Sequence, residues 1–403
     1  MKRSIWNLLF LISSFSLGAM FGFATVQELF PEWRGVQADY YRRLAQVTGD
    51  RSKAGTPLKI LQINLPEMKQ VDRCITCHVG ISNPKMADQP QPFRTHPDLG
   101  IPGFLAAHSF DEIGCTVCHH GQGRATTKLQ AHGPVAHWEE PLLPNDMVIG
   151  TCSTCHGNVM KLKGAEKLAK AQAMFEAKGC IGCHQLNGWG SLIGPELSET
   201  ANKNLDQLDF RHIHGPKTVA NWIDEHFKDP QQVTRAEPAI GIPESPMPNY
   251  DLTDEESRML TALVLSFGSQ VEKEERPIPS RFKIPAPAEK APEPVYASSI
   301  EHGKAVYQKY GCVACHGIEG RGGIRNNNMD LGEEVPPLVY VAEGFSREAL
   351  KETIREGKYP ARADRSGPTP PLWMPSWKQK LSEAELDAVV DYLLSLHPES
   401  PKK

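Results

Sequence analysis

The ten cysteines of the chain all lie in five copies of one short pattern, in which two cysteines bracket two residues and a histidine follows at once. The copies are CITCH (74–78), CTVCH (115–119), CSTCH (152–156), CIGCH (180–184) and CVACH (312–316). This spacing is the signature of covalent c-type haem, because both thiols add to one porphyrin and the adjacent imidazole reaches its iron. A zinc site, a disulfide or a redox C-x-x-C motif would leave the histidine unexplained. The pattern therefore predicts five covalently bound haem c groups.

Each motif supplies two thioether bonds and one iron ligand. The cysteines that form the thioethers are Cys74, Cys77, Cys115, Cys118, Cys152, Cys155, Cys180, Cys183, Cys312 and Cys315. The histidines that reach the iron from the proximal side are His78, His119, His156, His184 and His316. In GCTVCHHGQG (114–123), His119 is therefore the ligand and His120 is surplus to the motif.

Length, charge and the first residues limit the class of protein. A chain of 403 residues suggests about three domains, and a net charge of −4 without a basic patch gives no reason to expect nucleic acid. Residues 4–27 carry no charge, which matches the roughly 20 apolar residues that cross a bilayer. This favours an uncleaved anchor over a cleaved signal peptide, for which Gly22-Phe23-Ala24 would be a poor cleavage site. Because haem c is attached outside the cytoplasm, we expect an inner-membrane protein whose bulk is periplasmic, with Lys2 and Arg3 in the cytoplasm.

After the anchor, one apolar stripe follows helical spacing. Its residues are Leu29, Trp33, Val36, Tyr40, Leu44 and Val47. The favoured interpretation is that this stripe packs on its own domain, and the alternative is a docking face for a partner subunit.

The rest of the chain divides by composition into a mainly α architecture. Three motifs lie in a Pro- and Gly-rich segment, and two later segments each run from a helix into a motif and end in a capped helix. The predicted parts are a membrane anchor (1–27), a loop-rich trihaem domain (28–160), a monohaem domain (161–271), a Pro-rich linker (272–295) and a second monohaem domain (296–403). The linker is expected to be an extended, semi-rigid spacer.

The second axial ligand of the fourth and fifth haems is predicted to be a methionine. Met247 follows His184 and Met374 follows His316 at similar separations along the chain, each in a Met-Pro pair before a capped final helix. Both stand in polar, Pro-rich loops outside any helical stripe, at matching places in the two segments. Met259 instead lies within a helix, where core packing is expected.

The first three haems lack such a loop, but their segment holds five further histidines. Three bis-histidine haems would need three of them. We expect the ligands among His96, His108, His132 and His137, and rank His120 lowest because it would point away from its own haem. Met86 and Met147 are the next candidates.

The two later segments resemble class I cytochrome c over most of their length. The likeness rests on the motif, the Met-Pro loop, the terminal helices, Gly194-Pro195 and Pro336-Pro337. It implies a helix-rich, single-haem fold in which a proline carbonyl accepts a hydrogen bond from the proximal histidine. Pro195 fits this role in the first segment, and Pro336 and Pro337 both remain open in the second.

Residues 70–160 resemble multihaem subunits that accompany bacterial quinol-oxidising membrane complexes, of the cytochrome bc or alternative complex III kind. The likeness implies a respiratory electron-transfer subunit. Ligand supply disfavours an enzyme, because both later segments offer a methionine ligand and no Lys-ligated C-x-x-C-K motif occurs. Since Met/His ligation raises a haem potential above that of a bis-histidine pair, the potential should rise away from the anchor. The predicted path runs from the quinol-oxidising subunits through the trihaem segment to a soluble cytochrome or terminal oxidase. The alternative is a multihaem oxidoreductase with an open-site haem in the trihaem segment.

Overall fold

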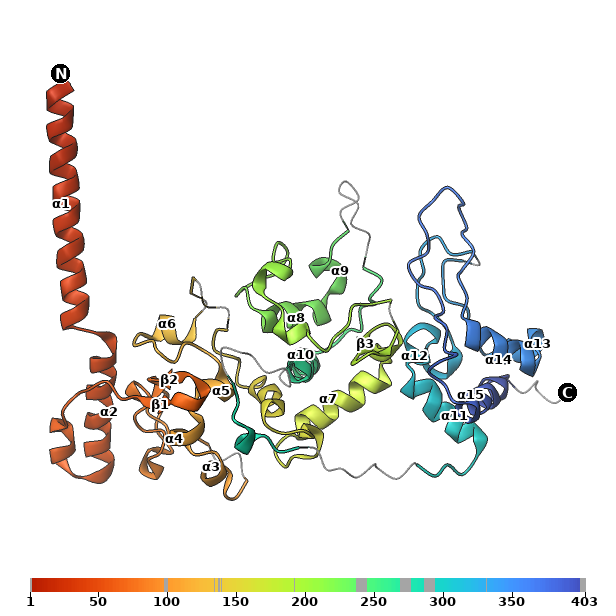
Figure 1. Cartoon of the computed structure of the whole chain (residues 1–403), viewed down its shortest axis with the longest axis horizontal. Helices are drawn as coiled ribbons and strands as arrows, with labels where there is room; N and C mark the ends of the chain where they lie inside the picture. The colour runs from red at the N-terminus through yellow and green to blue at the C-terminus, as the bar shows by residue number, and fades with distance from the viewer. Residues whose placement is uncertain are drawn as a thin grey trace. The chain divides into compact units, whose positions relative to one another are not determined.

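The computed structural model describes residues 2–398, except 98–100, 134, 137, 139, 192, 237–244, 269–276, 286–293 and 331. The fold is mainly α, as the sequence predicted, and the described strands form two short antiparallel hairpins (Figure 1). The chain divides into two compact units, built on Met1–Leu143 and on Pro144–Glu272 with Ile278–Lys403. Each unit is treated separately below.

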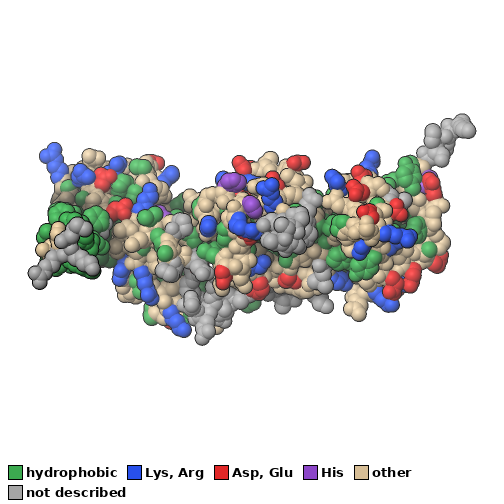
Figure 2. All heavy atoms as spheres, turned by 90° about the horizontal axis from the view of Figure 1, so that it is seen from above, with side chains coloured by type: hydrophobic (Ala, Val, Ile, Leu, Met, Phe, Trp, Pro, Cys, Tyr) green, Lys and Arg blue, Asp and Glu red, His purple; other side chains and the backbone are tan. Residues whose placement is uncertain are grey.

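The first helix, α1 (Lys2–Leu29), has 28 residues. Its segment Ser4–Val26 is long and apolar enough to cross a membrane. Large side chains such as Phe15, which is 79% exposed, cover its surface, and Figure 2 shows hydrophobic side chains gathered over this helix. By length and composition, a membrane anchor and a signal sequence both fit this segment.

The helix α2 (Glu32–Thr48) fixes the start of the first unit. Its Trp33 and Tyr40 are buried, and Tyr40 packs against Met86 and Phe93. The apolar stripe thus packs on its own domain, as the favoured interpretation predicted, although Leu29 and Val47 at its ends are exposed. The other elements are η1 (Arg51–Gly55), β1 (Ile63–Leu65), η2 (Pro66–Met68), β2 (Gln70–Asp72), η3 (Cys74–Thr76), η4 (Pro84–Met86), α3 (Phe104–Ala107), α4 (Phe110–Ile113), α5 (Thr116–His119) and α6 (Lys128–His132).

The strands β1 and β2 pair antiparallel, with Asn64 opposite Val71. This hairpin ends at Asp72, just before the first attachment motif. It therefore positions that motif against the rest of the first unit.

In the second unit, α7 (Glu166–Ala177) packs on α10 (Asp254–Gly268) through a core that includes Leu168, Phe175 and Leu263. The predicted capping pair of α10 is confirmed, because the Glu256 amide donates to the Thr253 hydroxyl at 3.2 Å. Between them lie η7 (Cys180–Gly182), β3 (Gln185–Leu186), β4 (Trp189–Gly190), η8 (Thr200–Asn202), η9 (Leu205–Gln207), α8 (Val219–Lys228) and α9 (Pro230–Val233), and η5 (Val148–Thr154) and η6 (Val159–Lys161) precede α7.

The last part of this unit is built on α11 (Ser299–Lys309) and α15 (Glu383–Ser395). A Cβ atom at Gly303 would overlap the Ala388 carbonyl, so glycine lets the two helices touch through their backbones. The predicted capping box of Ser382 and Glu385 is present at the start of α15. The remaining elements are η11 (Ser280–Phe282), α12 (Cys312–His316), η12 (Ile318–Gly320), α13 (Val341–Gly344) and α14 (Arg347–Glu356).

Two features of the second unit differ from the expected organisation. The third attachment motif belongs to this unit, because η5 packs on α10, where a Cβ at Gly150 would contact the Ala262 carbonyl. The Pro-rich linker is also hydrogen-bonded to this motif where it is described, since the Ile284 amide donates to the Cys155 carbonyl at 2.6 Å and the Ile284 carbonyl accepts from the Gly157 amide at 2.7 Å. Local composition could not reveal either contact, because both join segments far apart in the sequence.

Candidate functional site

All ten cysteines lie in the described part of the chain, and none forms a disulfide. Burial raises the pKa of Cys77 to about 11 and that of Cys312 to about 12, so these thiols are protonated at neutral pH.

The first two motifs are joined through the carboxylate of Asp72, which is fully buried. Its Oδ2 accepts the Cys115 amide at 2.6 Å and the Thr116 amide at 3.1 Å, and its Oδ1 accepts the Thr116 hydroxyl at 2.8 Å. These bonds satisfy donors at the start of the short helix α5. A Cβ at Gly114 or Gly123 would overlap this carboxylate, so glycine is required at both positions.

The first motif is also tied to α2. The buried amide of Gln37 donates to the carbonyls of Lys59 at 2.6 Å and Thr76 at 2.9 Å. Thr76, inside CITCH, in turn exchanges hydrogen bonds with the backbone of Leu61. The Asp72 carboxylate thus holds the start of the second motif close to the first motif, which begins two residues after it.

Two of the predicted distal histidines face proximal histidines. The ring centroids of His78 and His132 are 6.0 Å apart, and those of His119 and His96 are 6.1 Å apart. A metal–imidazole bond of about 2 Å on each side of an iron separates two ring centroids by about 6 Å. Both pairs therefore have the spacing of two axial ligands of one haem.

The protonation state of these rings also fits metal binding. Burial, followed by the charges of His132 and His119, lowers the pKa of His78 to about 4. Burial likewise lowers the pKa of His119 and of His132. Their imidazoles are thus neutral at pH 7, which is the form that binds a metal. The His96 Nδ1 lies 2.8 Å from the Pro97 carbonyl, which leaves Nε2 as its ligand atom.

The other candidates of the trihaem segment are placed differently. His108 stacks on Phe104, whose carbonyl lies 2.9 Å from its Nδ1. His120 has φ +58°, directly after α5, and His137 lies outside the described residues. Met86 is fully buried in the core beside Tyr40. These contacts do not identify the second axial ligand of the haem that His156 binds. His108 and His137 therefore remain predicted ligands.

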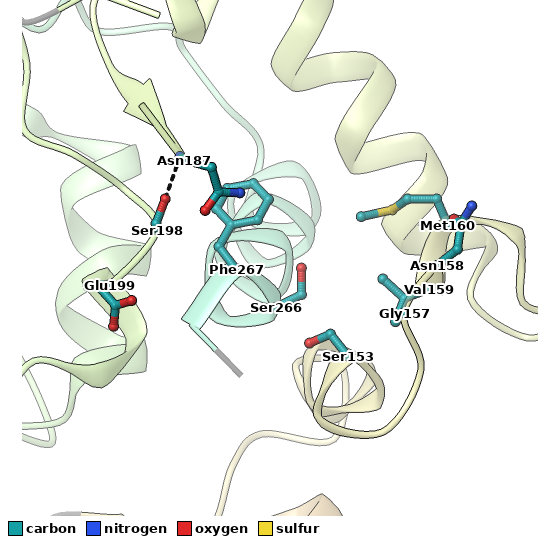
Figure 3. Close-up of a pocket in the computed structure, with 10 residues that line it drawn as sticks. All are labelled: Ser153, Gly157, Asn158, Val159, Met160, Asn187, Ser198, Glu199, Ser266 and Phe267. Atoms are coloured by element: carbon teal, nitrogen blue, oxygen red, sulfur yellow. Dashed lines mark hydrogen bonds between the residues drawn. The ribbon is translucent and has the colours of Figure 1, made fainter. Parts of the chain in front are cut away.

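A small cavity of about 220 Å³ adjoins the third motif. Ser153 and Gly157 line one side, Met160 stands near them, and Ser266 and Phe267 of α10 line another (Figure 3). Pockets for small organic ligands are usually about 300 Å³ or more, so the cavity is small for a substrate site.

The fourth and fifth motifs have the proline contacts that the resemblance implied. The Pro195 carbonyl lies 2.9 Å from Nδ1 of His184, and the Pro336 carbonyl lies 3.4 Å from Nδ1 of His316. In the second segment, the residue whose carbonyl faces the proximal histidine is therefore Pro336 and not Pro337. A Cβ at Gly194 would come within 2.6 Å of the His184 ring, so Gly194 lets the chain lie directly on that imidazole.

Both predicted methionine ligands stand in anchored loops of their own segments. Gln231 donates to the Met247 carbonyl at 2.5 Å, and Lys358 exchanges two backbone hydrogen bonds of 2.9 Å with Met374. Met374 also packs against the core of the last segment. The assignment of either sulfur to an iron stays a prediction.

The fourth and fifth motifs touch each other. A Cβ at Gly182 would overlap the Gly311 carbonyl, and a Cβ at Gly179 would overlap Ala314. Trp189 adds a ring contact with Tyr310, at 5.0 Å between centroids. Sequence reasoning missed this contact, although a glycine stands directly before Cys180 and before Cys312 as a visible signal.

Comparison with known proteins agrees with this geometry. The family model for cytochrome c matches the chain twice, at residues 168–267 and 300–397. No curated protein and no solved structure gave a match. The matched regions contain the fourth and fifth motifs with their proline contacts. Residues 168–267 and 300–397 therefore match cytochrome c domains, which supports a c-type cytochrome and implies covalently bound haem c in these two regions.

Proposed function

We propose that the protein is a membrane-anchored pentahaem electron-transfer subunit. It takes electrons from a quinol-oxidising membrane complex and passes them to a periplasmic acceptor, either a soluble cytochrome or a terminal oxidase. The α1 segment holds it at the inner membrane, and the bulk of the chain is periplasmic.

The observation that carries this proposal is the contact between attachment motifs. In the first unit, Asp72, two residues before Cys74, accepts the Cys115 amide. In the second unit, Gly182, directly before Cys183, packs against Gly311, directly before Cys312. Each thiol becomes a thioether on the edge of its porphyrin, so each contact sets two haem edges side by side. The rate of electron transfer falls steeply with the distance between two haems. These contacts shorten the step from the first to the second haem and the step from the fourth to the fifth.

The proposed axial ligands set the order of potentials. His132 completes the first haem opposite His78, and His96 completes the second opposite His119. Met247 and Met374 complete the fourth and fifth haems. Because a thioether ligand raises the potential relative to a second imidazole, the two cytochrome c domains are the high-potential end. The haem supplies the electron chemistry, and the protein supplies spacing and potential.

A redox titration of the purified full-length protein tests the proposal. The expected result is five covalently bound haems by intact mass, two with a near-red Met–Fe(III) band at high potential, and low-spin bis-histidine haems at lower potential. Fewer than five haems, or low-potential haems in the cytochrome c domains, would overturn it. A high-spin ferric haem at neutral pH would favour the open-site enzyme instead, with the third haem as the place to examine.

A further inference from the structure

The segment 317–335 connects two residues of the fifth haem site. It follows His316 directly and leads to Pro336, whose carbonyl faces that histidine. Its Gly322 amide donates to the His316 carbonyl at 2.7 Å. Asn326 lies in the middle of this segment, which is therefore attached at both ends to the proximal side of the site.

The side chain of Asn326 is 1% exposed and pairs with the backbone of Leu372. Its Oδ1 accepts the Leu372 amide at 3.0 Å, and its Nδ2 donates to the Leu372 carbonyl at 2.9 Å. The Nδ2 group also donates to the Met329 sulfur at 3.3 Å. Moving Leu372 away would leave a donor and an acceptor of this buried amide unpaired, which is costly.

The contact with Leu372 lies beside the predicted distal ligand, because Leu372 stands two residues before Met374. Leu372 is itself buried, and Met374 exchanges two backbone hydrogen bonds of 2.9 Å with Lys358. The side chain of Met374 packs against the same core as Cys312 of the attachment motif. The Met-Pro loop is therefore held by Asn326 on one side and by Lys358 on the other.

A second asparagine of the segment, Asn328, contacts the same loop farther from the methionine. Its Nδ2 donates to the carbonyls of Asp364 at 2.9 Å and Pro368 at 2.6 Å, and its Oδ1 accepts the Asp364 amide at 2.7 Å. Pro368 stands six residues before Met374. Asn328 thus fixes the far part of the loop, whereas Asn326 fixes the part next to the predicted ligand.

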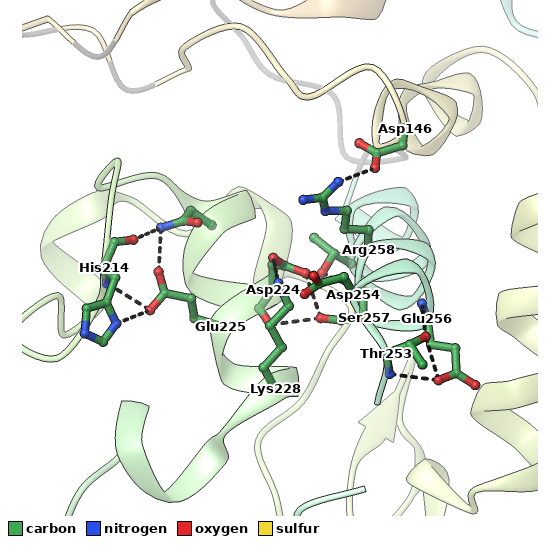
Figure 4. A network of polar contacts seen from close by, with 12 residues as sticks. Asp146, His214, Asp224, Glu225, Lys228, Thr253, Asp254, Glu256, Ser257 and Arg258 are labelled. Carbon is green, nitrogen blue, oxygen red and sulfur yellow. Dashed lines mark hydrogen bonds and ion pairs between the residues drawn. The ribbon is translucent and has the colours of Figure 1, made fainter. Parts of the chain in front are cut away.

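The domain of the fourth haem also supports its methionine loop with a side-chain amide. Gln231 of α9 donates to the Met247 carbonyl at 2.5 Å, and α9 contacts α8. The helix α8 is held on α10, where the Ser257 hydroxyl donates to the buried Asp224 carboxylate at 2.7 Å (Figure 4). The amide therefore comes from a helix in one domain and from the segment after the proximal histidine in the other.

We propose that Asn326 is a positioning residue for the fifth haem: by holding Leu372 in place, it keeps the Met374 sulfur on the iron. While the sulfur is bound, the sixth position of the iron is closed to external ligands. Asn326 thereby slows the opening of this position and keeps the fifth haem an electron carrier. The inference rests on the proposed Met374 ligation.

The test measures cyanide binding to the ferric full-length protein, since cyanide reaches the iron only after the methionine sulfur has left it. The loss of near-red absorbance follows this step at both methionine-ligated haems. Asn326→Leu, which keeps the size of the side chain, should speed the loss at one haem by about tenfold or more, because two hydrogen bonds that oppose the opening are removed. The other haem should react at its wild-type rate, and the fast phase should be absent from the double variant Asn326→Leu/Met374→Ala.

The matched control is Asn328→Gly, which removes the amide contacts of Asn328 and suits the backbone at φ +59°. It should lower the stability of the domain and leave both cyanide rates unchanged. Asn326→Ser should accelerate the same haem as Asn326→Leu, and it replaces that variant in the test if the leucine prevents folding.

Wild-type cyanide rates in Asn326→Leu and Asn326→Ser would overturn the inference and leave the proposed function intact. Equal acceleration in Asn328→Gly would also overturn it, because the effect would then follow from stability alone. If Met374→Ala keeps both near-red bands, the proposed Met374 ligation itself is wrong. The failure of the inference and the failure of the proposed function are therefore distinguishable.

Discussion

The imidazole rings of His96 and His119 lie 6.1 Å apart between centroids, and their planes meet at 76°. The His78–His132 pair has almost the same separation, 6.0 Å, but its planes meet at 39°. The relative orientation of two axial rings determines how the iron d orbitals split. We therefore expect two distinct low-spin ferric EPR signals, the more anisotropic one from the nearly perpendicular pair.

Replacing His96 by alanine tests this assignment. If His96 is the distal ligand of the second haem, His96→Ala should remove the more anisotropic low-spin signal and create one high-spin ferric haem. The matched control is His120→Gly, which removes the neighbouring imidazole and suits the backbone at φ +58°. The control should leave all low-spin signals unchanged. An unaltered spectrum for His96→Ala would exclude His96 as a ligand.

The Asp72 carboxylate supports a second prediction, on stability. In Asp72→Asn, the remaining side-chain oxygen can still accept the amides of Cys115 and Thr116, but the negative charge is lost and an NH2 group replaces the oxygen that now accepts the Thr116 hydroxyl. The free energy of unfolding of the first unit should fall by about 2–3 kcal/mol, since hydrogen bonds to a buried charge are lost. Denaturant unfolding, followed by the absorbance of the haems, measures this loss.

The exposed residue Asp88 provides the control for Asp72. Asp88→Asn makes the same chemical change at the surface, and its effect should stay within about 0.5 kcal/mol. Equal effects of the two variants would show that Asp72 does not hold the first two motifs together.

Local patterns in the sequence predicted the elements that depend on neighbouring residues. The five attachment motifs, the capping pair of Thr253 and Glu256 and the box of Ser382 and Glu385 are of this kind, because each acts within a few residues. The mainly α fold and the proline contact of Pro195 also follow from motif and resemblance.

Long-range contacts could not be read in this way. His132 lies far from His78 along the chain, and nothing in its local sequence distinguishes it from His108 as a partner. The role of Asp72 depends on the β1–β2 hairpin bringing it to α5. The contact of Gly182 with Gly311 depends on how two domains meet, which composition does not encode.

The glycine contact between the two cytochrome c domains leads to a third prediction. In Gly311→Ala, the added methyl group would overlap Gly182, in a backbone conformation with φ +71° that alanine rarely adopts. The contact should open, which would slow electron transfer between the fourth and fifth haems by about tenfold or more. Flash photoreduction followed by time-resolved absorbance measures this rate.

Gly188→Ala is the matched control for Gly311→Ala. Gly188 has nearly the same backbone conformation, φ +74°, but a Cβ there would meet nothing within 4 Å. It should share the loss of stability from backbone strain, about 1 kcal/mol, without any change in the electron-transfer rate. Equal rates in Gly311→Ala and the wild type would show that the contact is not on the electron path.

The fourth prediction concerns the pH dependence of the last domain. Burial alone would raise the pKa of Glu385, but hydrogen bonds from Lys309, Ser382 and Tyr310 more than offset it and hold the pKa at about 2. An unfolded glutamate titrates near pH 4.3. The native state therefore binds fewer protons between these two values, so Glu385 stabilises the fold above about pH 5 and loses that effect as the pH falls toward 2.

Glu385→Gln should consequently lower the free energy of unfolding by about 1–2 kcal/mol at pH 7, after allowance for the exposure of Lys309. The difference from the wild type should shrink steadily as the pH is lowered from 5 to about 2, because the wild-type carboxylate becomes protonated. Thermal unfolding between pH 7 and pH 2 measures both the difference from the wild type at pH 7 and its decrease at lower pH. The exposed residue Glu352 serves as control, and Glu352→Gln should have a small effect with little pH dependence. A constant difference between Glu385→Gln and the wild type down to pH 2 would mean that the charge of Glu385 does not stabilise the junction of α11 and α15.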